Sequence, residues 1–211
     1  LKELSDLYRQ ELLEGHSDLY FEVYNPEIIY WKVNQNIALL AMNGNDKSNA
    51  EINTILSETV SGGSMVESAD AYKHGRIDLQ LIPYYNRIVN LCFYIERNPD
   101  KRFIGGLEQL INDNNIRNYK TSEYDKTRWR VYSANLELLL ASSLARCGSE
   151  NGLQILVDYF DDIHSDFRRF ALNELVSITK ADFGYDASEW YKYLLNNKNF
   201  DICPLKKEVE L

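Results

Sequence analysis

A histidine among aspartates is the group of side chains in this sequence that comes nearest to a metal site. His164 stands close to Asp161, Asp162 and Asp166, and imidazole and carboxylate groups are common metal ligands. A metal site also needs a fixed geometry supported by surrounding residues, whereas this stretch falls in a turn between expected helices. We interpret it as a solvated turn whose side chains cap a helix, and we assign no metal ligand.

The carboxylates show no pattern that predicts acid–base catalysis. Acidic residues such as Glu108, Asp113, Glu137 and Glu174 stand apart from any patterned base. The sequence holds no HExxH, no CxxC, no Ser/His/Asp order and no Gly-rich phosphate loop. It therefore predicts no catalytic residue and no cofactor site, and we expect that the protein is not an enzyme.

The three cysteines are far apart in the sequence and form no disulfide framework. Cys92 and Cys147 fall on apolar helical faces without a patterned histidine, which predicts buried, inert thiols rather than nucleophiles. Cys203 precedes Pro204 near the C-terminus, and an exposed, reactive thiol stays open there. Unpaired cysteines favour a reducing compartment such as the cytoplasm, but the compartment is otherwise open.

The charge balance disfavours binding to nucleic acid. Thirty-two acidic and 23 basic residues give a net charge of −9, which repels a phosphate backbone. Arg128, Trp129 and Arg130, with Arg168 and Arg169, could make a basic aromatic patch, but pairing at helix ends is the better interpretation. No run approaches the about 18 apolar residues that a membrane span needs, so no span is expected.

Tyrosine is the one unusual count, at 15 residues. Tyr20, Tyr24, Tyr30, Tyr84 and Tyr85 could line a binding groove, because tyrosine offers contact area together with a polar group. They could equally form the outer edges of helices, and both interpretations stay open.

The elements that must position these side chains are almost all helical, because apolar residues recur with helical spacing between short polar joints. Residues 17–25 are the best strand-like stretch but could equally be an irregular lead-in, and residues 64–75 are either a short helix or a loop. The pattern predicts about nine helices, over residues 1–14, 26–43, 49–60, 77–97, 103–112, 129–147, 150–160, 166–179 and 186–195.

The helix expected over residues 129–147 is the most apolar. Its small residues would let neighbouring helices approach closely: Ala134, Ala141, Ser142, Ser143 and Ala145. Gly148 is expected to end this helix as a C-terminal cap.

Two recurrences indicate an internal repeat. Gly106-Leu107-Glu108-Gln109-Leu110-Ile111 returns as Gly152-Leu153-Gln154-Ile155-Leu156-Val157, each opening a short helix after a long one. The stripe Leu136, Leu139, Leu140, Leu144 and Cys147 returns as Phe167, Phe170, Ala171, Leu175 and Ile178.

The segment LARCGSENGLQILVDYFDDIHSDFRRFALNELVSITK, residues 144–180, resembles a HEAT repeat, particularly its short form. In that family an Asp follows the first helix, and the second helix opens on an apolar-Arg-x-x-Ala-x-x-x-Leu pattern. The matching residues are Asp162, Phe167, Arg168, Ala171 and Leu175. The resemblance covers residues 129–195 best and is fainter over 77–116. It implies that Arg168 pairs with Asp162 or with carbonyls of a neighbouring turn.

The stretch that follows resembles the ending that often closes such arrays. Gly184 is expected in a left-handed turn, Asp186 as the cap of the last helix, and Trp190 over the end of the core. We therefore expect an all-α fold of antiparallel helix pairs, stacked as a short HEAT-like superhelix. Its parts are an irregular helical N-terminal part (1–75), a HEAT-like repeat region (76–195) and a charged C-terminal tail (196–211).

Curved helical arrays present extended surfaces that suit protein or peptide partners. We therefore expect a non-catalytic protein-interaction or scaffold module. Because the chain begins at Leu1 without Met, we expect a C-terminal fragment of a larger protein or a processed product. Two alternatives stay open: a helical small-molecule-binding or enzymatic domain without a sequence motif, and an accessory domain of an enzyme on the same chain.

Overall fold

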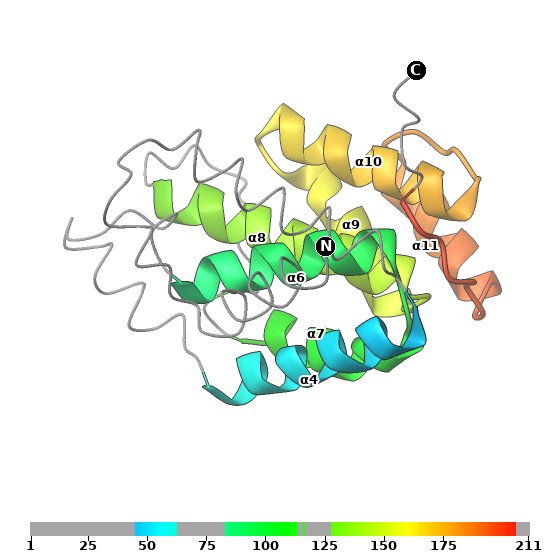
Figure 1. Cartoon of the computed structure of the whole chain (residues 1–211). Helices are drawn as coiled ribbons and strands as arrows, with labels where there is room; N and C mark the ends of the chain where they lie inside the picture. Colours follow the sequence, from blue (N-terminus) through cyan, green and yellow to red (C-terminus); the bar gives the residue numbers. More distant parts are fainter. Residues whose placement is uncertain (1–44, 63–82, 114–115, 117–127, 206–211) are drawn as a thin grey trace, which may run out of the picture.

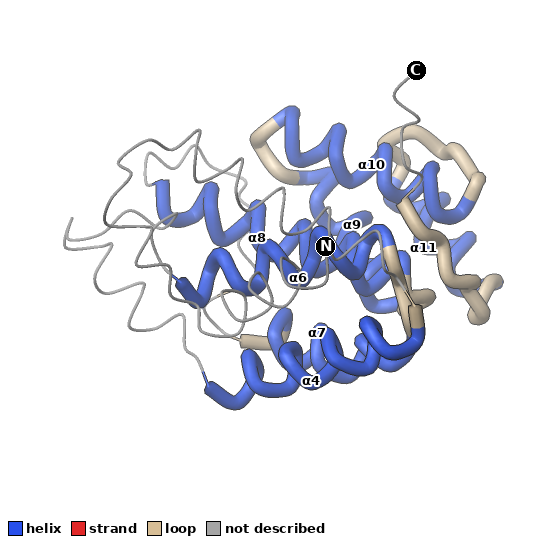
Figure 2. Tube along the Cα trace, in the orientation of Figure 1, coloured by secondary structure: helices blue, strands red, loops and turns tan. Residues whose placement is uncertain are grey.

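The computed structural model describes residues 45–62, 83–113, 116 and 128–205. Every regular element in these ranges is a helix, so the all-α fold class is confirmed for the described part of the chain (Figures 1 and 2). The α-helices are α4 (Asp46–Gly62), α6 (Pro83–Arg97), α7 (Ile104–Ile111), α8 (Arg128–Arg146), α9 (Glu150–Asp158), α10 (Ser165–Thr179) and α11 (Ala187–Asn196). Two 3₁₀ turns, Lys101–Phe103 and Tyr159–Asp161, flank α7 and α9.

The helices expected within the described ranges are confirmed, with small shifts at their ends. Helix α4 begins at Asp46 rather than at residue 49, because the side-chain oxygen of Asn45 accepts a hydrogen bond from the Ser48 amide at 3.0 Å. The helix expected over 77–97 is described from Pro83 onward. The helices expected over 1–14 and 26–43, the strand-like stretch 17–25 and the stretch 64–75 lie outside the described residues.

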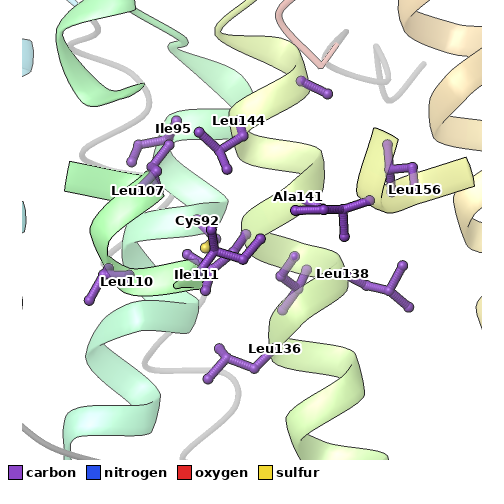
Figure 3. Packing of buried hydrophobic residues seen from close by; sticks show 14 of the residues in the cluster. Cys92, Ile95, Leu107, Leu110, Ile111, Leu136, Leu138, Ala141, Leu144 and Leu156 are labelled. Carbon is purple, nitrogen blue, oxygen red and sulfur yellow. The ribbon is translucent and has the colours of Figure 1, made fainter. Parts of the chain in front are cut away.

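Helix α8 is the centre of the described fold, because it packs against α6, α7, α9 and α10. Helix α11 packs on α9, and α4 packs on α6 and α7. Figure 3 shows side chains of α6 and α7 meeting those of α8 in one apolar interior, with Leu156 of α9 beside it. The labelled residues of that interior are almost completely buried, and burial of this kind supplies most of the free energy of folding.

Helices α8 and α9 approach each other closely at Gly152. A Cβ atom at Gly152 of α9 would lie 2.5 Å from the backbone nitrogen of Ala145 and 2.6 Å from the carbonyl oxygen of Ala141, both in α8. Ala141 and Ala145, two of the small residues expected to permit close approach, therefore do so. Gly148 ends α8 with φ 89°, and the Ser149 amide donates to the Leu144 carbonyl at 3.0 Å. The expected C-terminal cap is confirmed as a Schellman motif.

The connection from α10 to α11 has the expected form. Gly184 has φ 54°, and Asp186 caps α11 by accepting hydrogen bonds from the amides of Ser188 and Glu189. Trp190 is fully buried, and its indole N–H donates to the Gly184 carbonyl at 2.8 Å. These expectations about single residues are confirmed.

Helix α10 ends at a residue that the sequence patterns did not single out. Lys180 occupies the left-handed region with φ 62°, where a Cβ atom costs about 1 kcal/mol or more. We expect Lys180→Gly to raise the free energy of unfolding by about 0.5–1 kcal/mol, because glycine carries no such cost. Urea titration followed by circular dichroism measures the change. Lys180→Ala keeps a Cβ and should give no comparable gain; equal gains from both variants would contradict this explanation.

Within the described residues, no helix combines the length and the apolar character that crossing a bilayer requires.

Candidate functional site: a buried charge cluster beneath the C-terminal segment

A buried ion pair joins α8 to α10. The guanidinium of Arg146 is 1% exposed and meets the carboxylate of Glu174 with both arms, Nε to Oε2 at 2.9 Å and Nη2 to Oε1 at 3.0 Å. The hydroxyl of Ser142, one turn before Arg146, donates to Glu174 Oε2 at 2.6 Å. This forked geometry is the strong form of an Arg–carboxylate pair, and it fixes both helices at one point.

A second carboxylate, Glu96 of α6, shares this buried environment. The residue is 6% exposed, and its Oε1 atom has no hydrogen-bond partner among the described residues. Burial, reinforced by the negative charge of Glu174, raises the pKa of Glu96 to about 7, against the opposing effects of Ser142 and Arg146. Two carboxylates thus compete for one guanidinium, and Glu174 is the one that holds it.

The residues after α11 return to cover this charge cluster, which consists of Glu96, Ser142, Arg146 and Glu174. We call residues 197–205 the C-terminal segment. The Cys203 amide donates to the Arg146 carbonyl at 2.9 Å, and the Leu205 amide donates to the Glu96 carbonyl at 2.7 Å. In return, Arg146 Nη1 donates to the Cys203 carbonyl at 3.1 Å. Figure 1 shows the segment, in red, turning back from α11 past the end of α6.

Two further contacts fix the path of the C-terminal segment. A Cβ at Gly148 would lie 2.6 Å from the Phe200 carbonyl oxygen, so the segment passes directly over the end of α8. The Lys198 ammonium also pairs with Glu150 of α9 at 2.7 Å. The segment is therefore bound to α6 and α8 by main-chain hydrogen bonds and to α9 by the Lys198 side chain.

Glu96 should make stability depend on pH. Its pKa is about 7 in the folded state against an ordinary 4.5, so its stabilising effect is complete below pH 4.5 and is lost as pH rises to about 7. At about 1.36 kcal/mol per pKa unit, this costs about 2 to 3 kcal/mol between pH 5 and pH 8. We expect Glu96→Gln, which does not ionise, to gain that much relative to wild type over this range. Urea titrations at both pH values measure it; a constant difference would contradict the assignment.

A second buried polar contact joins α8 to the end of α9. The Tyr159 hydroxyl donates to Glu137 Oε2 at 2.6 Å and lies 3.3 Å from the Ala134 carbonyl oxygen. Burial, with the nearby charge of Glu137, raises the pKa of Tyr159 far above its ordinary value. The phenol therefore stays protonated and acts as a fixed donor that satisfies Glu137.

A third polar cluster joins α4 to the turn after α6. The Tyr94 hydroxyl donates to Asn49 at 2.8 Å, and Asn49 in turn donates to Asp100 at 3.3 Å. Arg102 bonds to Asp100 at 2.6 Å and to Asp46 at 2.7 Å. The hydrogen bond from Arg102 lowers the pKa of Asp100 to about 2. This cluster fixes the packing of α4.

The aspartates around His164 form a turn, as expected, but the interpretation of a solvated, helix-capping turn is wrong in two respects: Asp162 is buried, and the side chain of His164, the N-cap of α10, makes no capping hydrogen bond. Asp162 is 1% exposed, and its Oδ1 atom accepts from the His164 amide at 2.7 Å and meets the His164 ring Nδ1 at 2.8 Å. Arg168 donates to the carbonyls of Asp162 and Ile163. Of the two partners that the resemblance implied for Arg168, the carbonyls are therefore the ones present. Within the described ranges, no three His, Cys, Asp or Glu side chains are grouped as a metal would need.

The cysteines follow the sequence expectations closely. Cys92 and Cys147 are fully buried. Burial raises the pKa of Cys92 beyond its ordinary range and that of Cys147 to about 12, which disfavours the reactive thiolate. Cys203 is only partly buried, and its sulfur lies 3.8 Å from the Ser177 carbonyl oxygen.

The structure describes only some of the residues that the sequence suggested for a basic or aromatic surface. Arg169 pairs with Asp166 at 2.9 Å on the surface, so helix-end pairing is confirmed there. Tyr85 is 5% exposed and belongs to the core rather than to a groove. The side chains of the other residues singled out as a basic or tyrosine surface lie outside the described set: Tyr20, Tyr24, Tyr30, Tyr84, Arg128, Trp129 and Arg130.

Sequence reasoning missed the charge cluster itself. Glu174 was expected to lack a base, but Arg146 is its partner on another helix. A signal was present in α8: Ser142, expected only as a small residue, and Arg146 stand four residues apart on one face of the helix. Polar residues so placed indicate a polar partner across the helix interface. Glu96 left no such signal.

No family model, curated protein or solved structure matches this chain. The described part of this chain is all-α and holds a buried charge cluster to which the C-terminal segment is bonded.

Proposed function

We propose that this protein is a non-catalytic protein-interaction module, and that its binding site takes a non-helical peptide segment across the ends of α6 and α8. One observation carries the proposal: these helix ends already hold such a segment, residues 203–205, through main-chain hydrogen bonds from Cys203 and Leu205. Binding through main-chain groups, with side chains adding selectivity, is a general way to recognise peptides.

The way the helices contact one another supports a stacked helical array of the HEAT-like kind. Helices α6, α8 and α10 contact each other in turn, and α9 contacts α11, as two layers of helix pairs would. One feature departs from a simple repeat. Gly152 faces α8, whereas a Cβ at Gly106 would meet Leu56 of α4. The two Gly-Leu stretches therefore serve different contacts.

Exposed apolar side chains at the end of the described fold also support an interaction role. Tyr185 is 52% exposed and Leu195 is 67% exposed, which adds apolar area available to a partner. The net charge of −9 favours a protein partner over nucleic acid. An accessory domain of an enzyme on the same chain would use the same apolar surface, so this surface alone does not choose between the two.

Peptide binding by the full chain tests the proposal. The probe is a fluorescein-labelled peptide of residues 197–205, followed by fluorescence anisotropy. In Cys203→Pro the amide that donates to Arg146 is gone, so the chain's own segment should vacate the site and the peptide should bind saturably. Cys203→Ala keeps the amide and should bind at least tenfold more weakly. A Cys203→Pro protein with unchanged helicity and no peptide binding would refute the proposal.

A second candidate function is favoured by Glu96 alone. A carboxylate with its pKa raised to about 7 is suited to general acid–base work. This reading requires a small molecule to reach a side chain that is now 6% exposed. A ligand that raised the melting temperature of wild type but not of Glu96→Gln would favour the small-molecule alternative over the interaction module.

A further inference from the structure

The charge cluster and the C-terminal segment share the same atoms. Arg146 uses Nε and Nη2 for Glu174, and uses Nη1 for the Cys203 carbonyl of the segment. Its own carbonyl accepts from the Cys203 amide, and the carbonyl of Glu96 accepts from the Leu205 amide. A change of charge at Glu96 therefore acts where the segment is held.

The buried Oε1 of Glu96 has no hydrogen-bond partner among the described residues. A protonated carboxyl tolerates that position, because a neutral group loses less on burial than a charged one. An ionised carboxylate does not, because the guanidinium beside it is already engaged by Glu174. Water is then the missing partner, and the segment bonded to the Glu96 carbonyl is the element that we expect to move to admit it.

We propose that the C-terminal segment is a proton-controlled latch: it lies closed over α6 and α8 while Glu96 is protonated, and it opens when Glu96 ionises. The latch is a property of this chain alone. What its opening admits, a peptide segment of a partner protein, rests on the proposed function.

Among the described residues, the charged and titratable groups around Glu96 come from α6, α8, α10 and the C-terminal segment. Glu174 of α10 disfavours ionisation of Glu96, whereas Arg146 of α8 and Arg97 of α6 favour it. The Cys92 thiol lies one turn away on α6, and burial keeps it protonated. The segment itself contributes the Cys203 thiol. Because burial outweighs the two arginines, the pKa of Glu96 lies at about 7, and the latch should open as pH rises through that value.

Hydrogen exchange of the full chain tests the latch, with NMR or fragment mass spectrometry resolving the amides of Cys203 and Leu205. Corrected for intrinsic exchange rates, their protection should fall at least tenfold between pH 6 and pH 8. The amide of Leu156 in α9 is the internal control, because it reports global unfolding, and at both pH values its protection should stay at least tenfold above that of the segment. Constant protection of the segment, or protection of the segment equal to that of Leu156, would overturn the proposal.

Three variants connect the opening to Glu96. Glu96→Gln should hold the segment closed at both pH values. Should that variant fold poorly, two others shift the midpoint: Glu174→Gln removes a charge that raises the pKa of Glu96 and should move opening to lower pH, whereas Ser142→Ala removes an opposing contact and should move it to higher pH. If neither Glu174→Gln nor Ser142→Ala changes the pH midpoint of opening, the latch is refuted. Peptide binding by Cys203→Pro is a separate measurement, so failure of the latch and failure of the proposed function are distinguishable.

Discussion

Replacing Gly152 by alanine should destabilise the protein by about 2–3 kcal/mol, although alanine is the better helix former by about 1 kcal/mol. The added methyl group would lie 2.5 Å from a backbone nitrogen and 2.6 Å from a carbonyl oxygen of α8. Backbone atoms inside a helix do not rotate aside as a side chain does. Helices α8 and α9 must therefore separate, which weakens the contact at the centre of the core.

Urea titration of Gly152→Ala measures this loss, and Gly105→Ala is the matched control. Gly105 lies in α7, is exposed, and has nothing within 4 Å of the position that a Cβ would take. There the same substitution should leave stability unchanged or raise it by up to about 1 kcal/mol. If the two variants changed stability in the same direction, the close approach of α8 and α9 would not be the cause.

Arg146→Met should lower the free energy of unfolding by about 3–5 kcal/mol, because it leaves the carboxylate of Glu174 nearly buried without its cation. Glu96 lies beside the same site, so the two acids would face each other uncompensated. Differential scanning calorimetry at pH 7 measures the effect as a large fall in melting temperature.

Two controls separate burial from charge. Arg169→Met breaks an ion pair whose side chains are 70% and 79% exposed, and such pairs contribute about 0–1 kcal/mol. The double variant Arg146→Met, Glu174→Leu should recover most of the loss, because no charge is left stranded at that pair. A double variant as unstable as Arg146→Met would show that packing, rather than the unpaired carboxylate, causes the loss.

The sequence predicts those parts of the fold that depend on neighbouring residues. Gly148 ends α8 and Asp186 begins α11 as expected, because a cap acts within one turn of its own helix. The helical spacing of apolar residues likewise predicts the helices of the described ranges. Lys180 was missed because a left-handed residue that is not glycine leaves no local signature.

The charge cluster escaped prediction because its members meet only in three dimensions. Glu96, Arg146 and Glu174 come from three different helices, and no spacing along the chain relates them. The C-terminal segment was expected to be a charged tail, yet Phe200 and Cys203 pack against the core. Which residues a returning segment covers depends on the angles between helices, and the periodicity of a single helix does not contain that information.

The returning segment also bears on cooperativity. Where helices stack in a row, each contacts mainly its neighbours, and the ends of the row can fray separately. Here the residues after α11 form hydrogen bonds with α6 and α8. The last part of the described chain is therefore bonded to helices that come much earlier in the sequence. Unfolding at one end then removes contacts from the other. We therefore expect the described helices to unfold in one cooperative transition rather than pair by pair.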